Sequence, residues 1–167
     1  MQEFLILVDE NDTAIGEMEK MEAHQKGLLH RAFSVVVFNT DGKMLLQQRA
    51  AVKYHSPLLW TNACCGHPRH GEETVNAAKR RLKEENGFDC ELKESFVFQY
   101  KASFDNGLTE NEIDHVFIGH YDGEIPFNPD EAAAVKWLTM EEIATQVAEN
   151  PDNFTVWFKI LLQEMNV

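Results

Sequence analysis

The segment from Trp60 to Phe88 constrains the fold of this chain more than any other, because it joins a glycine-containing loop to an amphipathic helix that ends in acids. The helix is predicted over Glu72–Asn86, and Gly87 stands where a left-handed residue would end it. The apolar residues of this helix share one face, namely Val75, Ala78 and Leu82. Acids at a helix end that faces a glycine loop can hold a divalent cation, which in turn neutralises a diphosphate. The alternative is a solvated acidic helix end.

Strands and helices are predicted to mix without regular alternation in the rest of the chain. Strands are expected over Phe4–Asp9, Ala32–Phe38, Lys43–Arg49, Phe96–Phe104, Ile113–Tyr121 and Ala134–Leu138, with a short extended segment at Trp60–Cys65. Further helices are expected over Lys20–Lys26, Thr139–Glu149 and Phe154–Met165. For 167 residues, this pattern indicates an α/β or α+β sandwich with a mixed sheet, folded as a single domain over residues 1–167.

Turns and caps refine this prediction. The turn at Asn39–Gly42 predicts that the strands on either side of it pair as a hairpin. A second turn, at Asp105–Gly107, joins the two longest strands. Thr139 and Glu142 have the spacing of a capping box at the start of a helix. The last predicted helix carries a continuous apolar stripe, formed by Phe154, Trp157, Phe158, Leu161, Leu162 and Met165.

The charge of the chain bears on its partners. A net charge of -13 argues against nucleic-acid binding, which needs a basic face. The charge is uneven, however: basic residues outnumber acidic ones between Lys20 and Lys101, whereas Lys136 is the only base between Asp105 and Asn150. The first half could therefore hold an anionic substrate. The alternative is that the second half is simply a solvated acidic surface.

The location of the protein is expected to be cytoplasmic. The start of the chain lacks the basic residues of an export signal, and no apolar run approaches the ~20 residues of a membrane helix. The three cysteines, Cys64, Cys65 and Cys90, cannot all pair, and no CxxC spacing is present. A disulfide framework and a cysteine-only zinc site are therefore not expected.

The spacing after Gly66 resembles the Nudix box. Five residues separate Gly66 from Glu72, seven more follow, and the run Arg80-Arg81-Leu82-Lys83-Glu84-Glu85-Asn86-Gly87-Phe88 then matches nearly every fixed position. Arg81 departs from the pattern, because Nudix hydrolases carry there a Glu of the metal cluster that activates water. An Arg removes a metal ligand and adds a phosphate clamp. The resemblance therefore implies a box that binds a diphosphate but hydrolyses it poorly.

A wider set of segments resembles the type 1 isopentenyl diphosphate isomerases, over about Phe4 to Leu162. The matching segments are His30-Arg31-Ala32-Phe33-Ser34, Leu45-Leu46-Gln47-Gln48-Arg49-Ala50, Trp60-Thr61-Asn62, Cys65-Gly66-His67-Pro68 and Glu110-Asn111-Glu112. The resemblance implies a Nudix-type α/β/α sandwich. It also implies interconversion of isopentenyl and dimethylallyl diphosphate, through protonation of the alkene, a tertiary carbocation and deprotonation.

The resemblance implies four catalytic residues. Cys65 is the acid/base on one side of the substrate, and Glu112 is its counterpart on the other side, assisted by Tyr100. Trp157 offers its π face to the cation. Each has a plainer alternative: Cys65 as a small buried residue, Tyr100 as an ordinary strand residue and Trp157 as part of the core. Cys64 offers a second thiol, but neighbours in an extended segment point to opposite sides.

The resemblance also implies binding residues. A transition metal, Mn²⁺ or Zn²⁺, is expected at His24, His30, His67, Glu110 and Glu112. A Mg²⁺ ion that arrives with the substrate is expected at Glu85, and the diphosphate at Lys20, Arg49, Lys53 and Arg81. Glu72 and Glu84 also match the box, but they are weaker candidates for metal ligands. Glu84 could instead pair with Arg80 on the helix surface. Surface or structural roles are expected for His55, His70, His115 and His120.

The expected partner is a small isoprenoid diphosphate, without nucleic acid or membrane, and the chain is expected to be a monomer or homodimer. Two rivals differ in class. The first is a Nudix hydrolase of a nucleotide or other diphosphate, against which Arg81 and the pair Cys65 and Glu112 argue. The second is a catalytically inactive Nudix binding module. Such a module would be expected to lack Cys65 or Glu112, and both residues are present.

Overall fold

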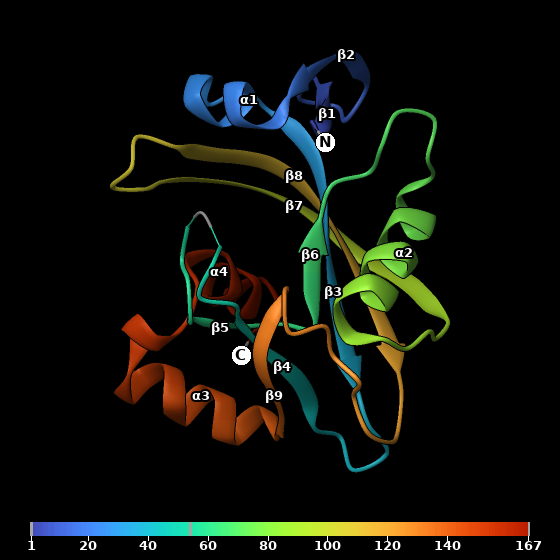
Figure 1. The fold of residues 1–167 in the computed structure, drawn as a ribbon, viewed down its shortest axis with the longest axis vertical. Helices are drawn as coiled ribbons and strands as arrows, with labels where there is room; N and C mark the ends of the chain where they lie inside the picture. The colour runs from blue at the N-terminus through green and yellow to red at the C-terminus, as the bar shows by residue number, and fades with distance from the viewer. Residues whose placement is uncertain (1, 54, 167) are drawn as a thin grey trace.

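The computed structural model describes residues 2–53 and 55–166, and the strands of this part of the chain form one mixed sheet (Figure 1). The main path of the sheet runs through β2 (Ala14–Glu19), β1 (Phe4–Val8), β3 (His30–Phe38), β4 (Met44–Arg49) and β5 (Trp60–Thr61). The other strands branch from this path: β6 (Cys64–Gly66) and β8 (Thr109–His120) pair with β3, β7 (Leu92–Ser103) with β8, and β9 (Ala132–Leu138) with β4.

β3 is the central strand of the site described below. It pairs antiparallel with β6 and parallel with β8, so both of its edges are covered. Its side chains alternate between two cores, because successive residues of a strand point to opposite faces. Phe33, Val35 and Val37 lie in one core, as the alternation predicts, and Val36 lies in the other.

β3 and β4 leave the predicted turn together but pair only beside it, where Phe38 lies opposite Met44. Beyond this point β3 continues between β6 and β8, whereas β4 continues between β5 and β9. The predicted hairpin is therefore correct at the turn and wrong along the strands. Both strands satisfy their backbone groups with partners from later in the chain, and the sheet divides into two halves.

Helices cover both faces of the sheet, which confirms the predicted α/β/α sandwich (Figure 1). On one face α2 (Thr74–Asn86) buries Ala77, Ala78 and Leu82. On the other face α3 (Met140–Glu149) and α4 (Val156–Glu164) complete the second core. The predicted capping box is present in α3. A short 3-10 helix (Pro151–Asn153) precedes α4.

Gly87 ends α2 as predicted, with φ 76°. A Cβ atom there would lie 2.3 Å from the carbonyl oxygen of Pro126, so both the backbone conformation and the available space require glycine. Among the described residues, no helix combines the length and the apolar character that crossing a membrane requires.

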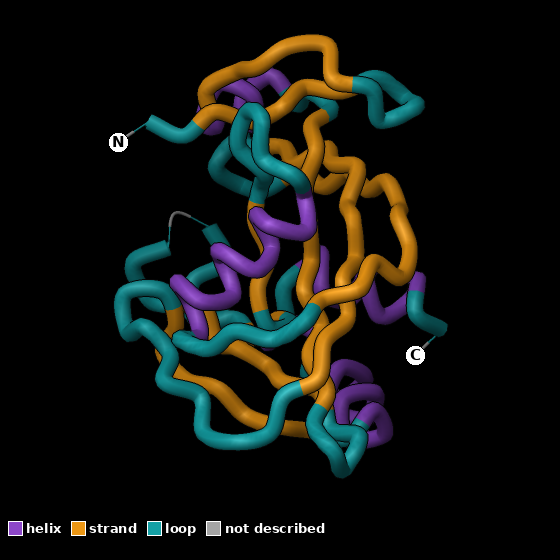
Figure 2. The backbone as a smooth tube through the Cα atoms, turned by 90° about the vertical axis from the view of Figure 1, so that its right-hand side faces the viewer, coloured by secondary structure: helices purple, strands orange, loops and turns teal. Residues whose placement is uncertain are grey.

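The N-terminal part forms a small unit at one end of the sheet (Figures 1 and 2). β1 and β2 pair antiparallel, and α1 (Lys20–Lys26) follows as predicted, ending at Gly27 with φ 66°. β2 was not among the predicted strands, because its side chains are largely exposed and lack apolar alternation. The unit carries Lys20 and His24 to the site.

β7 and β8 form a long antiparallel hairpin that closes at the predicted turn. β8 begins at Thr109 rather than at the predicted Ile113, so Glu110 and Glu112 both lie on the strand. Because they are two residues apart, their side chains share one face of the sheet. This face looks into the cavity that forms the candidate site.

Candidate active site

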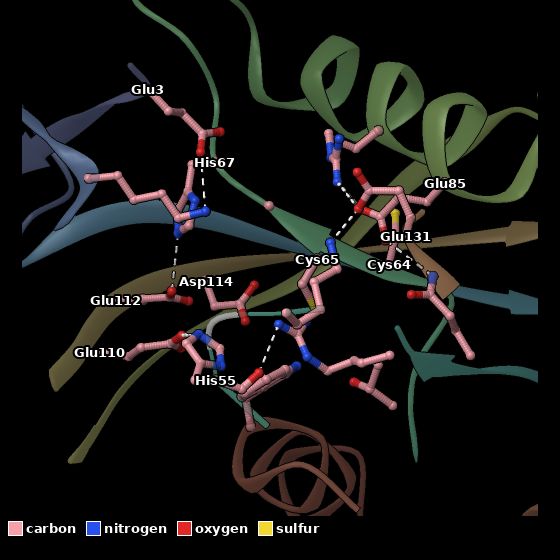
Figure 3. Close-up of a pocket in the computed structure, with 18 of the residues that line it drawn as sticks. Glu3, His55, Cys64, Cys65, His67, Glu85, Glu110, Glu112, Asp114 and Glu131 are labelled. Atoms are coloured by element: carbon pink, nitrogen blue, oxygen red, sulfur yellow. Dashed lines mark hydrogen bonds and ion pairs between the residues drawn. The ribbon is translucent and has the colours of Figure 1, made fainter. Parts of the chain in front are cut away.

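A cavity of about 450 Å³ lies between the two halves of the sheet (Figure 3). Its walls come from α1, β4, β5, β6, β7, β8, α2, α4 and the segment that follows β4. The structure places in these walls most of the predicted site residues: Lys20, Arg49, Lys53, Cys65, His67, Arg81, Glu85, Tyr100, Glu110, Glu112 and Trp157. The other two, His24 and His30, are buried behind His67. Residues that are far apart in the sequence are thus brought together at one site.

The two neighbouring thiols on β6 belong to different environments. Cys64 is buried in the core beneath α2, whereas Cys65 packs against the opposite core and faces polar groups. The Cys65 thiol donates to Asn62 Oδ1 at 3.4 Å and lies 3.5 Å from Ser34 Oγ. Burial, followed by the charge of Asp114, raises the pKa of the Cys65 thiol well above its ordinary value. This thiol therefore keeps its proton at neutral pH.

Three carboxylates line one face of β8, at Glu110, Glu112 and Asp114 (Figure 3). Tyr100, opposite Glu112 in the β7–β8 pairing, donates a hydrogen bond to Glu110. Burial and the charges of Glu112 and Glu110 raise the pKa of the Tyr100 hydroxyl well above its ordinary value. Sequence reasoning missed Asp114, although its spacing continues the alternation of the two glutamates.

Three imidazoles and one carboxylate form a buried group that could hold a metal ion. The ligand atoms of His24, His30, His67 and Glu112 all lie within 4.8 Å of one another. Burial, then the neighbouring imidazoles, lower the pKa of His24 to about 4. Burial, then His30 and Lys20, lower that of His67 to about 3. Both rings are therefore neutral near pH 7, which is the form that binds metals.

Glu110, the fifth predicted ligand, is not part of this group. Its Oε1 lies 3.0 Å from His55 Nε2, and it accepts the hydrogen bond of Tyr100. His55 was expected to be a surface or structural residue. It is buried in the cavity wall, where its ring stacks on Phe104 with 5.0 Å between centroids. The residues that contact the His55 ring are far from it in the sequence, so no local sequence pattern indicates these contacts.

Arg81 and Lys53 lie at the other end of the cavity, beside Glu85 and Glu131 (Figure 3). Arg81 Nη2 lies 2.7 Å from Glu85 Oε2 and 3.0 Å from Glu131 Oε2, and Lys53 also pairs with Glu131. Lys20 lies instead at the end of the cavity that holds His67, where it pairs with Glu3 at 3.1 Å. Sequence reasoning missed both Glu131 and Glu3. The three predicted cations each face a carboxylate, so they are held in place before any anion binds.

The residues with weaker motif support, Glu72 and Glu84 among them, form ion pairs with basic side chains or lie at the surface. Arg80 forms ion pairs with Glu72 at 2.9 Å and with Glu84 at 3.0 Å, so the pairing expected in the plainer alternative for Glu84 is present. The side chain of His70 is 80% exposed. His115 lies between Asp12 and Glu94. Neither these two histidines nor His120 lines the cavity.

Trp157 closes the apolar side of the cavity. It is buried on α4, with the Arg49 guanidinium 5.0 Å from its ring centroid. The ring of His55 meets it edge-on at 5.4 Å. Arg49 therefore places a positive charge of the cavity wall beside the indole.

Known proteins resemble this chain in both sequence and fold. The NUDIX domain model matches residues 28–158. The isopentenyl-diphosphate Delta-isomerase of Serratia proteamaculans is 48% identical, with 99% of this chain and 92% of that protein covered. The isopentenyl-diphosphate Delta-isomerase 2 of Photorhabdus laumondii is 51% identical, with 99% and 94% covered.

Solved structures share the fold at low sequence identity. A MutT protein from Methanosarcina mazei has a TM-score of 0.67 at 16% identity, over 83% of this chain and 93% of that one. A MutT NUDIX hydrolase from Burkholderia pseudomallei has a TM-score of 0.62 at 22% identity, over 81% and 96%. Together with the relatives that match nearly from end to end, these likenesses show that the chain belongs to the Nudix superfamily and, within it, to the isopentenyl-diphosphate Delta-isomerase family.

Proposed function

We propose that this protein interconverts isopentenyl and dimethylallyl diphosphate, with Cys65 and Glu112 as the two proton-transferring groups. The observation that carries the proposal is a protonated thiol and a carboxylate in the walls of one cavity, on strands on either side of β3. An unactivated alkene needs an acid at one carbon and a base at another, in a site from which water is excluded. The relatives that carry this name support the same reaction.

The proton transfers follow from the surroundings of each group. The raised pKa of Cys65 keeps a proton available for the alkene, and proton transfer to carbon leaves a tertiary carbocation. Glu112, with Tyr100 opposite it in the sheet, accepts a proton from the neighbouring carbon, which forms the new double bond. The reverse reaction uses the same groups with their roles exchanged.

The metal group fits a first-row cation by its donor set. His24, His30, His67 and Glu112 would hold Mn²⁺ or Zn²⁺, both of which accept imidazole and carboxylate ligands. Glu110, two residues before Glu112 on β8, is proposed as a further ligand, which would require it to exchange its contact with His55 for the cation. When bound, the cation would supply positive charge next to Glu112.

The basic side chains in the cavity wall would hold the diphosphate. Lys20, Arg49, Lys53 and Arg81 all line the cavity, and guanidinium groups bind phosphate oxygens in pairs. Glu85 would hold a Mg²⁺ ion that arrives with the substrate. Arg81 occupies the position of a hydrolase acid and pairs with Glu85, which favours binding of the diphosphate over its hydrolysis.

Proton NMR of isopentenyl diphosphate incubated with the protein and Mg²⁺ tests this function. The proposal predicts that resonances of dimethylallyl diphosphate appear, and that solvent deuterium enters the isoprenoid chain. Phosphate release is measured in the same samples with a panel of nucleotide and other diphosphates. Phosphate release without isomerisation would overturn the proposal in favour of a Nudix hydrolase.

The Trp157 indole is expected to stabilise the carbocation. Turnover should fall in the order Trp, Phe, Leu at residue 157, because Phe keeps a π face and Leu has none. Loss of a desolvated cation–π contact of ~2 kcal/mol slows the reaction by roughly thirtyfold at most. KM should change little, because the bound substrate carries no carbocation. Turnover and thermal melts of Trp157→Phe and Trp157→Leu check this ordering.

Phe158→Leu is the matched control for Trp157, because Phe158 is fully buried in the same helix and does not line the cavity. This variant should lose stability but keep its turnover per folded molecule. If Trp157→Leu turns over at the wild-type rate while fully folded, the indole belongs to the core alone.

A further inference from the structure

Ser34 is a polar residue in the middle of an otherwise apolar buried run on β3. It is 1% exposed, and Phe33, Val35, Val36 and Val37 around it are fully buried. A buried hydroxyl without partners destabilises a fold, so this side chain is expected to have hydrogen-bond partners. An alanine or valine would fill the same place in the strand with no polar group to satisfy.

The pairing of the sheet places Ser34 between the thiol and the acidic strand. Ser34 lies directly opposite Cys65 in the β3–β6 pairing, and β8 runs along its other side. Ser34 Oγ donates to Asp114 Oδ2 at 2.7 Å and lies 3.5 Å from Cys65 Sγ. One hydroxyl thus connects the sulfur on β6 with a carboxylate on β8.

Asn62 supports the thiol from the other side. Its Nδ2 donates to the carbonyl oxygens of Val35 at 2.9 Å and Cys64 at 3.0 Å, so the amide orientation is fixed. Its Oδ1 accepts from the Cys65 thiol at 3.4 Å. The sulfur is therefore held between Ser34 and Asn62, both of which are buried and anchored elsewhere.

We infer that Ser34 is a positioning residue, which acts through Cys65 by keeping the thiol turned into the cavity. This inference rests on the proposed role of Cys65. A cysteine side chain has three staggered rotamers about its Cα–Cβ bond, and these place the sulfur in different directions. A displacement of about 1 Å at a reacting group can cost a hundredfold in rate. Contact with Ser34 keeps the sulfur of Cys65 in one of these directions.

Ser34→Ala and Ser34→Thr test this role. Alanine removes both contacts, so kcat should fall about tenfold or more, whereas KM should change less than about twofold because the diphosphate end of the cavity is untouched. Threonine restores the hydroxyl and should return kcat to within about threefold of wild type. Both variants are measured with isopentenyl diphosphate and Mg²⁺, at a temperature where thermal melts show complete folding.

Ser103→Ala is the matched control. Ser103 also stands on a strand and makes a hydroxyl–hydroxyl contact, with Thr109 Oγ1 at 3.3 Å, but it is exposed and does not line the cavity. This variant should keep the wild-type kcat. If Ser34→Ala does not fold, Ser34→Cys keeps the volume with a much weaker hydrogen-bonding group, and it should show the same loss of kcat.

The failure of this inference can be separated from that of the proposed function by Cys65→Ala, assayed in parallel. An inactive Cys65→Ala beside a fully active Ser34→Ala or Ser34→Cys would overturn the positioning role alone. A loss in Ser34→Thr equal to that in Ser34→Ala, with both folded, would overturn it as well, as would a raised KM at unchanged kcat. An active Cys65→Ala would instead overturn the role of the thiol.

Discussion

Cys65→Ala is expected to lower isomerisation by about a thousandfold, because alanine offers no group that can give or take a proton in the place of the thiol. Incorporation of deuterium from solvent into the isoprenoid chain should be lost to the same extent. The fold should survive, because the Cys65 side chain borders the cavity and alanine is smaller. Proton NMR of isopentenyl diphosphate in D₂O measures both the reaction and the labelling.

Cys64→Ala is the control that the chain itself provides. This thiol is the immediate neighbour of Cys65 and also borders the cavity, but its side chain packs in the core beneath α2. Most of the activity should therefore remain, and any loss should follow the folded fraction. Equal damage from both substitutions would mean that the two thiols act together or that the other thiol carries the proton.

His67→Ala is expected to remove the transition metal and most of the activity. His67 is one of three imidazoles in the buried metal group, and its loss leaves two imidazoles and one carboxylate. We expect about one transition-metal ion per chain in the wild-type protein and far less in the variant, because imidazole is the ligand that such metals prefer. Elemental analysis of the purified proteins measures this difference. Binding of Mg²⁺ together with the substrate should persist, since Glu85 lies at the other end of the cavity.

His70→Ala is the matched control, because His70 is three residues away and its side chain is 80% exposed. Its metal content and activity should equal those of the wild type. A wild-type preparation that retains full activity after chelation has removed every transition metal would contradict the expectation of two separate metal sites.

The parts of the fold that depend on neighbouring residues could be predicted from the sequence. The helix from Glu72 to Asn86 was predicted within two residues of α2, because its apolar stripe and Gly87 are local signals. The capping box of Thr139 and Glu142 is equally local. The spacing of Glu110 and Glu112 was enough to place both on one face of a strand.

The parts of the fold that depend on pairing between distant segments could not be predicted from the sequence. β2 has exposed side chains and owes its place to pairing with β1. The divergence of β3 from β4 follows from strands that come later in the chain. The resemblance named candidates for reaction and binding, most of which line the cavity, but it did not name the residues that contact them, such as Ser34 and Glu131. Each of these contacts its partners across more than 25 positions of sequence, and no periodic pattern reports such a contact.

The parallel pairing of β3 with β8 has a consequence for how activity arises during folding. His30 lies opposite Glu112 in this pairing, so two predicted ligands of one metal meet only after a long loop has closed. Loop closure of this kind makes folding slow, because entropy is lost before the contacts form. The cavity also needs Trp157 from the last helix. During synthesis the metal group can therefore form only after β8 has emerged, and the cavity wall is complete only after α4 has emerged. Recovery of activity on refolding should follow the slowest folding phase.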